Sequence, residues 1–208
     1  HRAQAAEAGT LTIMSPYVAQ ELEFEQQGYI GHDRNSGQSN AQGYVGEIGV
    51  SPTSWYRAEF EGAFTRDPGP GQNLHYDSFN VENTFALTEP GEYWLDPALF
   101  YEMDFARHSP NDIIFGVLAA KEINPPARGM NGLLETVNLL AHKDYGPGQT
   151  PMGFIYSNQL RYHYKVWLEP GFEVYGDTSG KARFADQQFA TGPGIFGKLY
   201  TFNGQALK

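Results

Sequence analysis

Apolar and polar residues alternate with a period of two along most of the chain. In the stretch 56–64, YRAEFEGAF, the tyrosine, an alanine and both phenylalanines fall on one face, while Arg57, Glu59 and Glu61 fall on the other. Successive side chains of a β-strand point to opposite sides, so this stretch predicts a strand with one apolar and one polar face. The pattern recurs in FNVENTFAL at 79–87.

About ten such stretches lie between residues 21 and 202, each roughly nine to eleven residues long, which is the length of a tilted membrane-spanning strand. One of them, YWLDPALFYEM at 93–103, places Leu99 opposite Asp96 and Glu102. No helical period of comparable length is present. The sequence therefore predicts an all-β fold of about ten strands.

The connections between these stretches alternate between long and short. GHDRNSGQSN at 31–40 and RDPGPGQNLH at 66–75 are long, whereas SPTS at 51–54 and TEPGE at 88–92 are tight turns. An exception is the longer connection at 124–132. Short turns at one end and long loops at the other are typical of an up-and-down antiparallel β-barrel in an outer membrane. A β-sandwich with Greek-key crossovers has no reason to alternate so regularly.

Aromatic residues gather beside the predicted tight turns. Rings of Trp and Tyr favour the level of the lipid headgroups, where the ring is apolar and its N–H or O–H stays hydrated. The alternative is a set of aromatic plugs closing one end of a soluble barrel. The residues predicted to form a membrane-interface belt are Trp55, Tyr56, Tyr93, Trp94, Tyr164, Trp167 and Tyr200.

Composition narrows the function classes. The 208 residues include 24 acidic and 14 basic side chains, a formal charge of −10, which argues against binding of nucleic acid. The chain has no cysteine, which excludes disulfides and thiolate chemistry. No stretch approaches about 18 consecutive apolar residues, so a transmembrane helix is not expected. A membrane barrel remains open, because its alternating strands are polar on average.

Three segments carry a resemblance to a known family. ENTFALTEPGEYWLDPALFYEMD at 82–104, DIIFGVLAAKEI at 112–123 and LRYHYKVWLEPGFEVYGD at 160–177 resemble a family of uncharacterised proteobacterial outer-membrane β-barrel proteins. The pattern ENxFxLTEPGxYWLD at 82–96 is the most specific part. The resemblance implies an exported protein of the bacterial outer membrane, in contact with its lipid. It also implies about twelve strands in full-length relatives, so either the last strands are missing here or this barrel closes with ten.

The predicted organisation is a flexible segment at 1–14 followed by one barrel domain at 15–208. If the apolar faces meet lipid, the polar faces line a lumen. With ten to twelve strands, that lumen is expected to be narrow or filled by an Arg–carboxylate network, rather than a wide cation-favouring pore. The predicted lumen-lining residues are Glu23, Glu47, Arg57, Glu59, Glu61, Glu82, Asp96, Glu102, Arg161, Glu169 and Glu173.

Candidate catalytic groups do not stand out. Carboxylate pairs such as Glu59 and Glu61 suit acid–base chemistry, but they arise automatically from a period of two. His142 and His163 fall on predicted inward faces without the spacing of metal ligands. We therefore expect no enzyme activity, no cofactor and no metal.

Two functions of different classes follow from these expectations. The first is a porin-like channel for small solutes, or a structural scaffold that meets a protein partner in a native complex. The second is a soluble or secreted β-barrel or sandwich that binds a small ligand. They differ in the direction of the side chains, since Phe60 and Leu99 point outward in the first and into a dry core in the second.

Overall fold

The computed structural model describes residues 13–18, 23–30, 42–69, 71–107, 110–124, 131–146, 151–178, 187–197, 199–200 and 206–207. Its strands are β1 (Glu23–Ile30), β2 (Gln42–Thr53), β3 (Tyr56–Arg66), β4 (His75–Ala86), β5 (Asp96–Ala106), β6 (Asn111–Ile123), β7 (Leu133–Tyr145), β8 (Gly153–Tyr162), β9 (Glu169–Asp177), β10 (Gln188–Phe196), β11 (Leu199–Tyr200) and β12 (Ala206–Leu207).

Ten of these strands form one sheet in which the spatial order, β1 to β10, is the order along the chain. Each neighbouring pair is antiparallel, so the sheet is an up-and-down meander, and β11 and β12 form a separate two-stranded pair. The predicted all-β meander is confirmed. Within the described residues no pairing joins β1 to β10, so the sheet is not closed.

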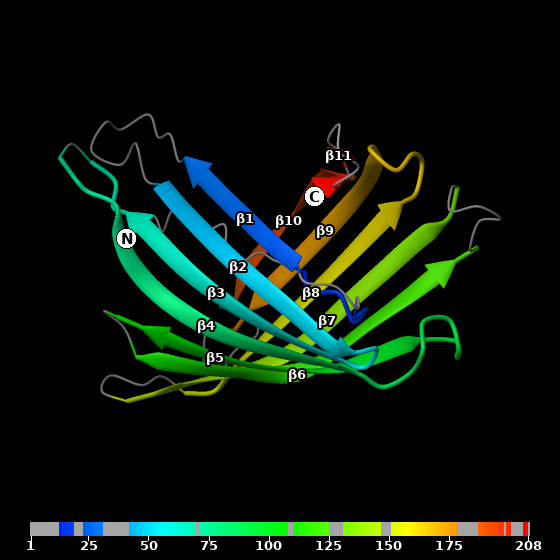
Figure 1. Ribbon diagram of the computed structural model, residues 1–208, viewed down its shortest axis with the longest axis horizontal. Helices are drawn as coiled ribbons and strands as arrows, with labels where there is room; N and C mark the ends of the chain where they lie inside the picture. Colours follow the sequence, from blue (N-terminus) through cyan, green and yellow to red (C-terminus); the bar gives the residue numbers. More distant parts are fainter. Residues whose placement is uncertain are drawn as a thin grey trace.

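The sheet is strongly curled (Figure 1). Strands β4 to β7 form its floor, while β1 and β2 rise on one side and β8 to β10 on the other. Such curvature follows from the right-handed twist that accumulates over many antiparallel strands. Because the sheet is curled, it has a concave inner face and a convex outer face. Among the described residues there is no helix long and apolar enough to cross a bilayer.

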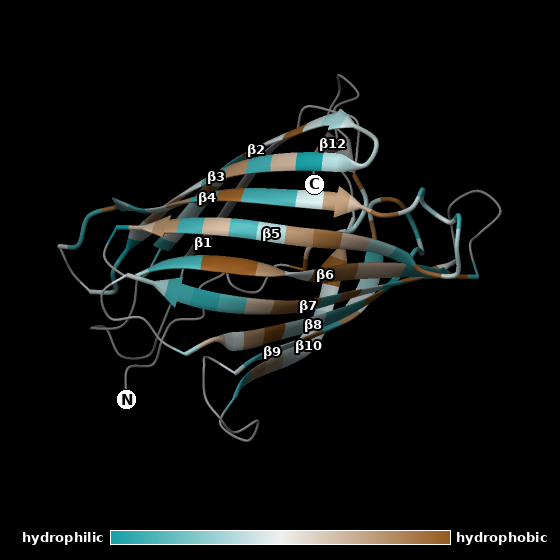
Figure 2. Ribbon diagram, turned by 90° about the horizontal axis from the view of Figure 1, so that it is seen from below, coloured by the Kyte–Doolittle hydropathy of each residue, from teal (hydrophilic) through white to brown (hydrophobic). Residues whose placement is uncertain are grey.

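The alternation of the sequence becomes a difference between these two faces. On β5, Ala98 is fully buried and Glu102 is 5% exposed on the inner face, whereas Leu99 is 47% exposed on the outer face. Hydrophobic and hydrophilic positions alternate along β5 and its neighbours in Figure 2. The predicted direction of Phe60 and Leu99 outward, with Glu102 inward, is confirmed.

Among the described residues, the buried side chains include eight polar and six apolar ones. The apolar part of the inner face is a cluster of Ala98, Phe100, Leu118 and Leu140 on β5 to β7. Such polar side chains require partners inside the curl, because an unpaired buried polar group is costly. The buried polar side chains are Thr84, Asp96, Glu102, Thr136, Asn138, Ser157, Gln159 and Thr178.

Strand boundaries differ from the predicted ones at two turns. The strand expected to begin at Tyr93 begins at Asp96, because Asp96 Oδ1 accepts a hydrogen bond of 2.8 Å from the Gly91 N–H and holds the preceding residues in the turn. The turn expected at 51–54 is shorter, since β2 continues to Thr53 with an irregularity between Val50 and Thr53. Pro52 lies there, and proline lacks the N–H that a regular ladder needs.

Candidate functional site: the inner face of the sheet

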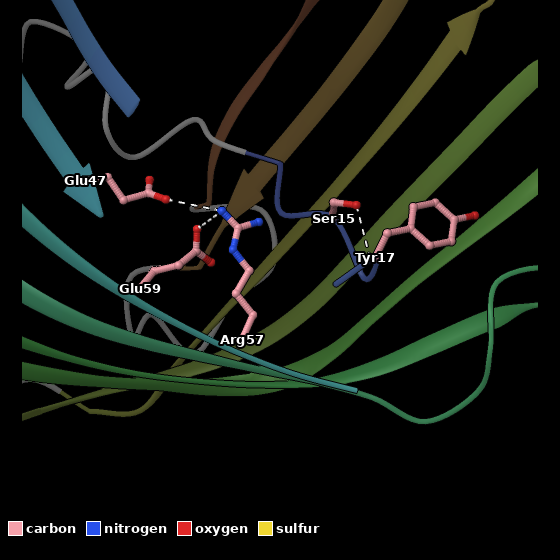
Figure 3. Close-up of polar contacts among 5 residues, drawn as sticks. All are labelled: Ser15, Tyr17, Glu47, Arg57 and Glu59. Atoms are coloured by element: carbon pink, nitrogen blue, oxygen red, sulfur yellow. Dashed lines mark hydrogen bonds and ion pairs between the residues drawn. The ribbon is translucent and has the colours of Figure 1, made fainter. Parts of the chain in front are cut away.

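Arg57 on β3 is the centre of an ion-pair cluster on the inner face. Its Nη2 lies 2.5 Å from Glu59 Oε1 and 3.5 Å from Glu47 Oε1 of β2, and all three side chains are largely buried (Figure 3). Gly49 leaves room for this guanidinium, because a Cβ at Gly49 would lie 3.1 Å from Arg57 Nη2. The pairing offsets the cost of removing the three charges from water.

Next to this cluster, carboxylates lie in a row across three strands. Glu59, Glu82 and Glu102 are direct neighbours in the register of β3, β4 and β5. Like charges in this arrangement repel one another. Asn80 relieves part of the repulsion, since its Nδ2 donates to Glu61 Oε1 at 3.3 Å and to Glu102 Oε1 at 3.1 Å. We call the inner face of β2 to β5 that carries these residues the acidic region.

A second polar group lies on β8 and β9. Gln159 Nε2 donates to Glu173 Oε1 at 2.6 Å, and Arg161 Nε lies 3.2 Å from Glu169 Oε2. His163 Nδ1 is 2.7 Å from the other oxygen of Glu169. Carboxylates on this side are thus paired with an amide, a guanidinium and an imidazole.

These groups contain nearly all the predicted lumen-lining residues. Glu23 faces Gly49 in the register of β1 and β2, but its side chain lies outside the described residues. The others lie on the inner face: Glu47, Arg57, Glu59, Glu61, Glu82, Asp96, Glu102, Arg161, Glu169 and Glu173.

The predicted belt aromatics lie mainly at the turns that follow β2, β4 and β8, which a meander places at one end of the sheet. Lysines accompany some of them: Lys121 Nζ lies 5.5 Å from the ring centre of Trp94, and Lys165 Nζ lies 5.1 Å from those of Tyr164 and Trp167. The tyrosine of β11 has no described side chain. Exposed side chains in this set are Trp55, Tyr93, Trp94, Tyr164 and Trp167, while Tyr56 stacks on Phe85.

The segment 13–18 lies against the inner face of β5 to β8, far from its own place in the sequence. The Met14 N–H donates to Asn138 Oδ1 at 2.9 Å, and Asn138 Nδ2 donates to the Met14 carbonyl at 2.9 Å. The Tyr17 hydroxyl donates to Asp96 Oδ2 at 2.9 Å. Burial, and then this bond, raise the pKa of Tyr17 well above its usual value.

This contact was not predicted from the sequence. Residues 13–18 straddle the boundary predicted between the terminal segment and the domain, and no pattern in them indicates a partner. The sequence signal that could have indicated the contact is Asn138, because an inward asparagine needs bonds to both its oxygen and its nitrogen. Ser157 Oγ also donates to Asn138 Oδ1, at 3.2 Å.

Another arrangement that was not predicted lies at the start of β6 and the end of β7. Donor atoms of Asp112, His142 and Asp144 all lie within 4.8 Å of one another. His142 Nδ1 is 3.5 Å from Asp112 Oδ2, and its Nε2 is 3.4 Å from Asp177 Oδ1 of β9. No metal site was predicted here, because these residues lack the sequence spacing of metal ligands. Brought together by the pairing of β6 and β7, with Asp177 beside them on β9, they offer a proton-sharing network or a mixed N/O donor set.

The outer face carries an apolar groove over β4 to β6. The groove has almost no polar lining. The groove is lined by Phe85, Leu99, Phe100, Tyr101, Phe115, Gly116 and Val117.

Comparisons of the chain with protein-family models, with curated proteins and with solved structures gave no match. The resemblance to an outer-membrane family therefore stays an expectation from the sequence.

Proposed function

We propose that the chain is a β-barrel of the bacterial outer membrane, with a narrow acidic interior that passes small cations. The strands cross the lipid, the outer face contacts the acyl chains, and the inner face lines the passage. Closure of the sheet into a barrel belongs to this proposal.

The observation that carries it is the inversion between the two faces. Large apolar side chains on each of the nine strands β2 to β10 are exposed on the outer face, while ionisable and amide side chains are buried on the inner one. A soluble monomer rarely exposes so much contiguous apolar surface. In lipid the same surface is solvated. The outward side chains include Ile48, Phe60, Phe79, Leu99, Phe115, Val117, Leu139, Phe154, Leu160, Phe172 and Ile195.

Strand length and turn chemistry support the same placement. Strands β2 to β10 are 9 to 13 residues long, which suits a tilted crossing of the hydrocarbon layer. Aromatic rings with nearby lysines at one end match a headgroup interface, because the ammonium reaches the phosphates while the ring lies in the boundary layer.

The acidic region supports a preference for cations. Its carboxylates outnumber the guanidinium of Arg57, and a passage lined by one sign of charge raises the local concentration of counter-ions. Ten strands leave little room once side chains fill the inside. A passage that is narrow rather than wide follows.

The test is reconstitution of the detergent-purified protein in planar bilayers with unequal KCl concentrations. We expect small conductance steps and a reversal potential that indicates a preference for potassium. Glu61→Gln should reduce this preference, because it removes a carboxylate from the acidic region without changing the size of the side chain. Glu89→Gln, in an exposed turn, is the matched control and should leave it unchanged.

Large open steps without ion preference would contradict a narrow acidic passage. No conductance at all would contradict the channel function and favour the structural scaffold, which was the other function expected of a membrane barrel. Localisation has a separate test. Carbonate washing of membranes should leave the protein in the pellet, and release without detergent would instead support the soluble ligand-binding alternative.

A further inference from the structure

Asn138 holds a peptide backbone in the manner of a neighbouring strand. Its amide accepts from the N–H and donates to the C=O of the same residue, Met14, with both bonds at 2.9 Å. Two such bonds to one residue are what an antiparallel ladder supplies from a partner backbone. Because Asn138 is 1% exposed, this pairing takes place in a deeply buried part of the inner face.

Two further contacts flank this pairing and differ from it in chemistry. The Met14 side chain packs on the apolar cluster of Ala98, Phe100, Leu118 and Leu140. Three residues along, the Tyr17 hydroxyl donates to Asp96 at 2.9 Å. Pro16, between them, is buried. The inner face of β5 to β7 thus offers an amide that binds backbone, an apolar cluster and a carboxylate that accepts from a hydroxyl.

We propose that this part of the inner face is a binding site for an extended peptide, and that the segment 13–18 of this chain is its ligand and closes the passage. The closing role rests on the proposed channel function, whereas the binding site stands without it. The Asn138 amide binds backbone atoms, the apolar cluster favours an apolar side chain, and Asp96 favours a hydroxyl or another hydrogen-bond donor.

The position of the segment gives the closing role its physical basis. In Figure 3, Ser15 and Tyr17 lie on the concave side of the sheet, the side on which Glu47, Arg57 and Glu59 also lie. The segment therefore shares the interior with the acidic region. An ion that crosses the interior must pass beside it or displace it.

Cysteine labelling tests the binding site directly, since the chain has no cysteine of its own. A Met14→Cys variant keeps both backbone bonds to Asn138. Adding Asn138→Leu removes them with little change in side-chain volume. We expect a thiol reagent that does not cross membranes to label residue 14 at least about tenfold faster in the double variant, because about 1.4 kcal/mol corresponds to a factor of ten. Asn158→Leu, outward on β8, is the control and should not change the rate.

Conductance tests the closing role. Replacing residues 13–17 with glycine and serine leaves every strand intact, so it remains informative even where Asn138→Leu impairs folding. We expect this variant to conduct in larger or longer steps than the parent chain. A synthetic peptide with the sequence of residues 13–18, added to the variant, should reduce the conductance again, and the same peptide with phenylalanine in place of tyrosine should do so at higher concentration.

The outcomes separate the claims. Equal labelling rates with Asn138 and with Asn138→Leu would overturn the binding site. Faster labelling together with unchanged conductance in the glycine–serine variant would overturn the closing role and leave the site. If neither the parent nor that variant passes ions, the channel function fails and the closing role fails with it, while the labelling result still decides whether the site exists.

Discussion

Two parts of the inner face differ in where their buried polar groups find partners. In the acidic region, carboxylates on adjacent strands are held by Arg57 and Asn80 from the same strands. Over β5 to β8, in what we call the covered region, Asn138 and Asp96 also bond to a segment that lies 124 and 79 residues away along the chain. The first arrangement is built into the sheet, and the second depends on a separable piece of chain.

The largest expected effect breaks the acidic region. Arg57→Met removes the cation and leaves Glu47 and Glu59 buried without it. Removing one partner of a buried ion pair costs about 3–5 kcal/mol of unfolding free energy. Denaturant unfolding in detergent micelles measures this. Arg107→Met, at an exposed position, should change the value by no more than about 0.5 kcal/mol. Equal effects of the two would show that the cluster has no structural role.

An intermediate effect on the free energy of unfolding is expected in the apolar cluster of the covered region. Leu118 is fully buried, so Leu118→Ala should cost about 3 kcal/mol through lost burial and a residual cavity. Leu139 lies on the neighbouring strand and is 59% exposed on the outer face. Leu139→Ala should cost no more than about 1 kcal/mol. The same unfolding assay measures both, and a larger cost at Leu139 would reverse the assignment of the faces.

The smallest effect concerns the hydrogen bonds that the segment 13–18 makes to the sheet. Tyr17→Phe removes a donor to Asp96 and should cost about 1 kcal/mol. The raised pKa of Tyr17 gives a sign for pH: the contribution is present below the ordinary tyrosine pKa of about 10 and is lost as the pH rises through the raised value. The difference in stability between parent and variant should therefore shrink at high pH. Tyr44→Phe, at an exposed hydroxyl, should show no such difference.

Much of the fold could be predicted because a period of two is a local property. The directions of Phe60, Leu99 and Glu102 follow from alternation alone, and the meander follows from the rhythm of turns and loops. What alternation does not determine is the register between strands. That Glu59, Glu82 and Glu102 form one row depends on turn lengths and on irregularities such as the one between Ala63 and Phe64.

The contacts that lay beyond prediction join residues without a shared pattern. Nothing in the letters around Met14 indicates that its backbone pairs with Asn138, because any residue other than proline has the same backbone donor and acceptor. The cluster of Asp112, His142 and Asp144 was missed for a related reason. Its members are separated by a loop and lie together only because β6 and β7 are paired.

Gly116 shows how close packing of two backbones can make a position intolerant of substitution. With a Cβ 2.1 Å from the Leu139 carbonyl, every other amino acid would force β6 and β7 apart. A mutational scan of this chain would therefore show Gly116 among its strictest positions, beside Asn138 and Arg57. Conservative replacements distinguish these positions. A side chain such as that of Asn138 or Arg57 can be replaced by a chemically similar one, whereas at Gly116 every side chain adds the same Cβ.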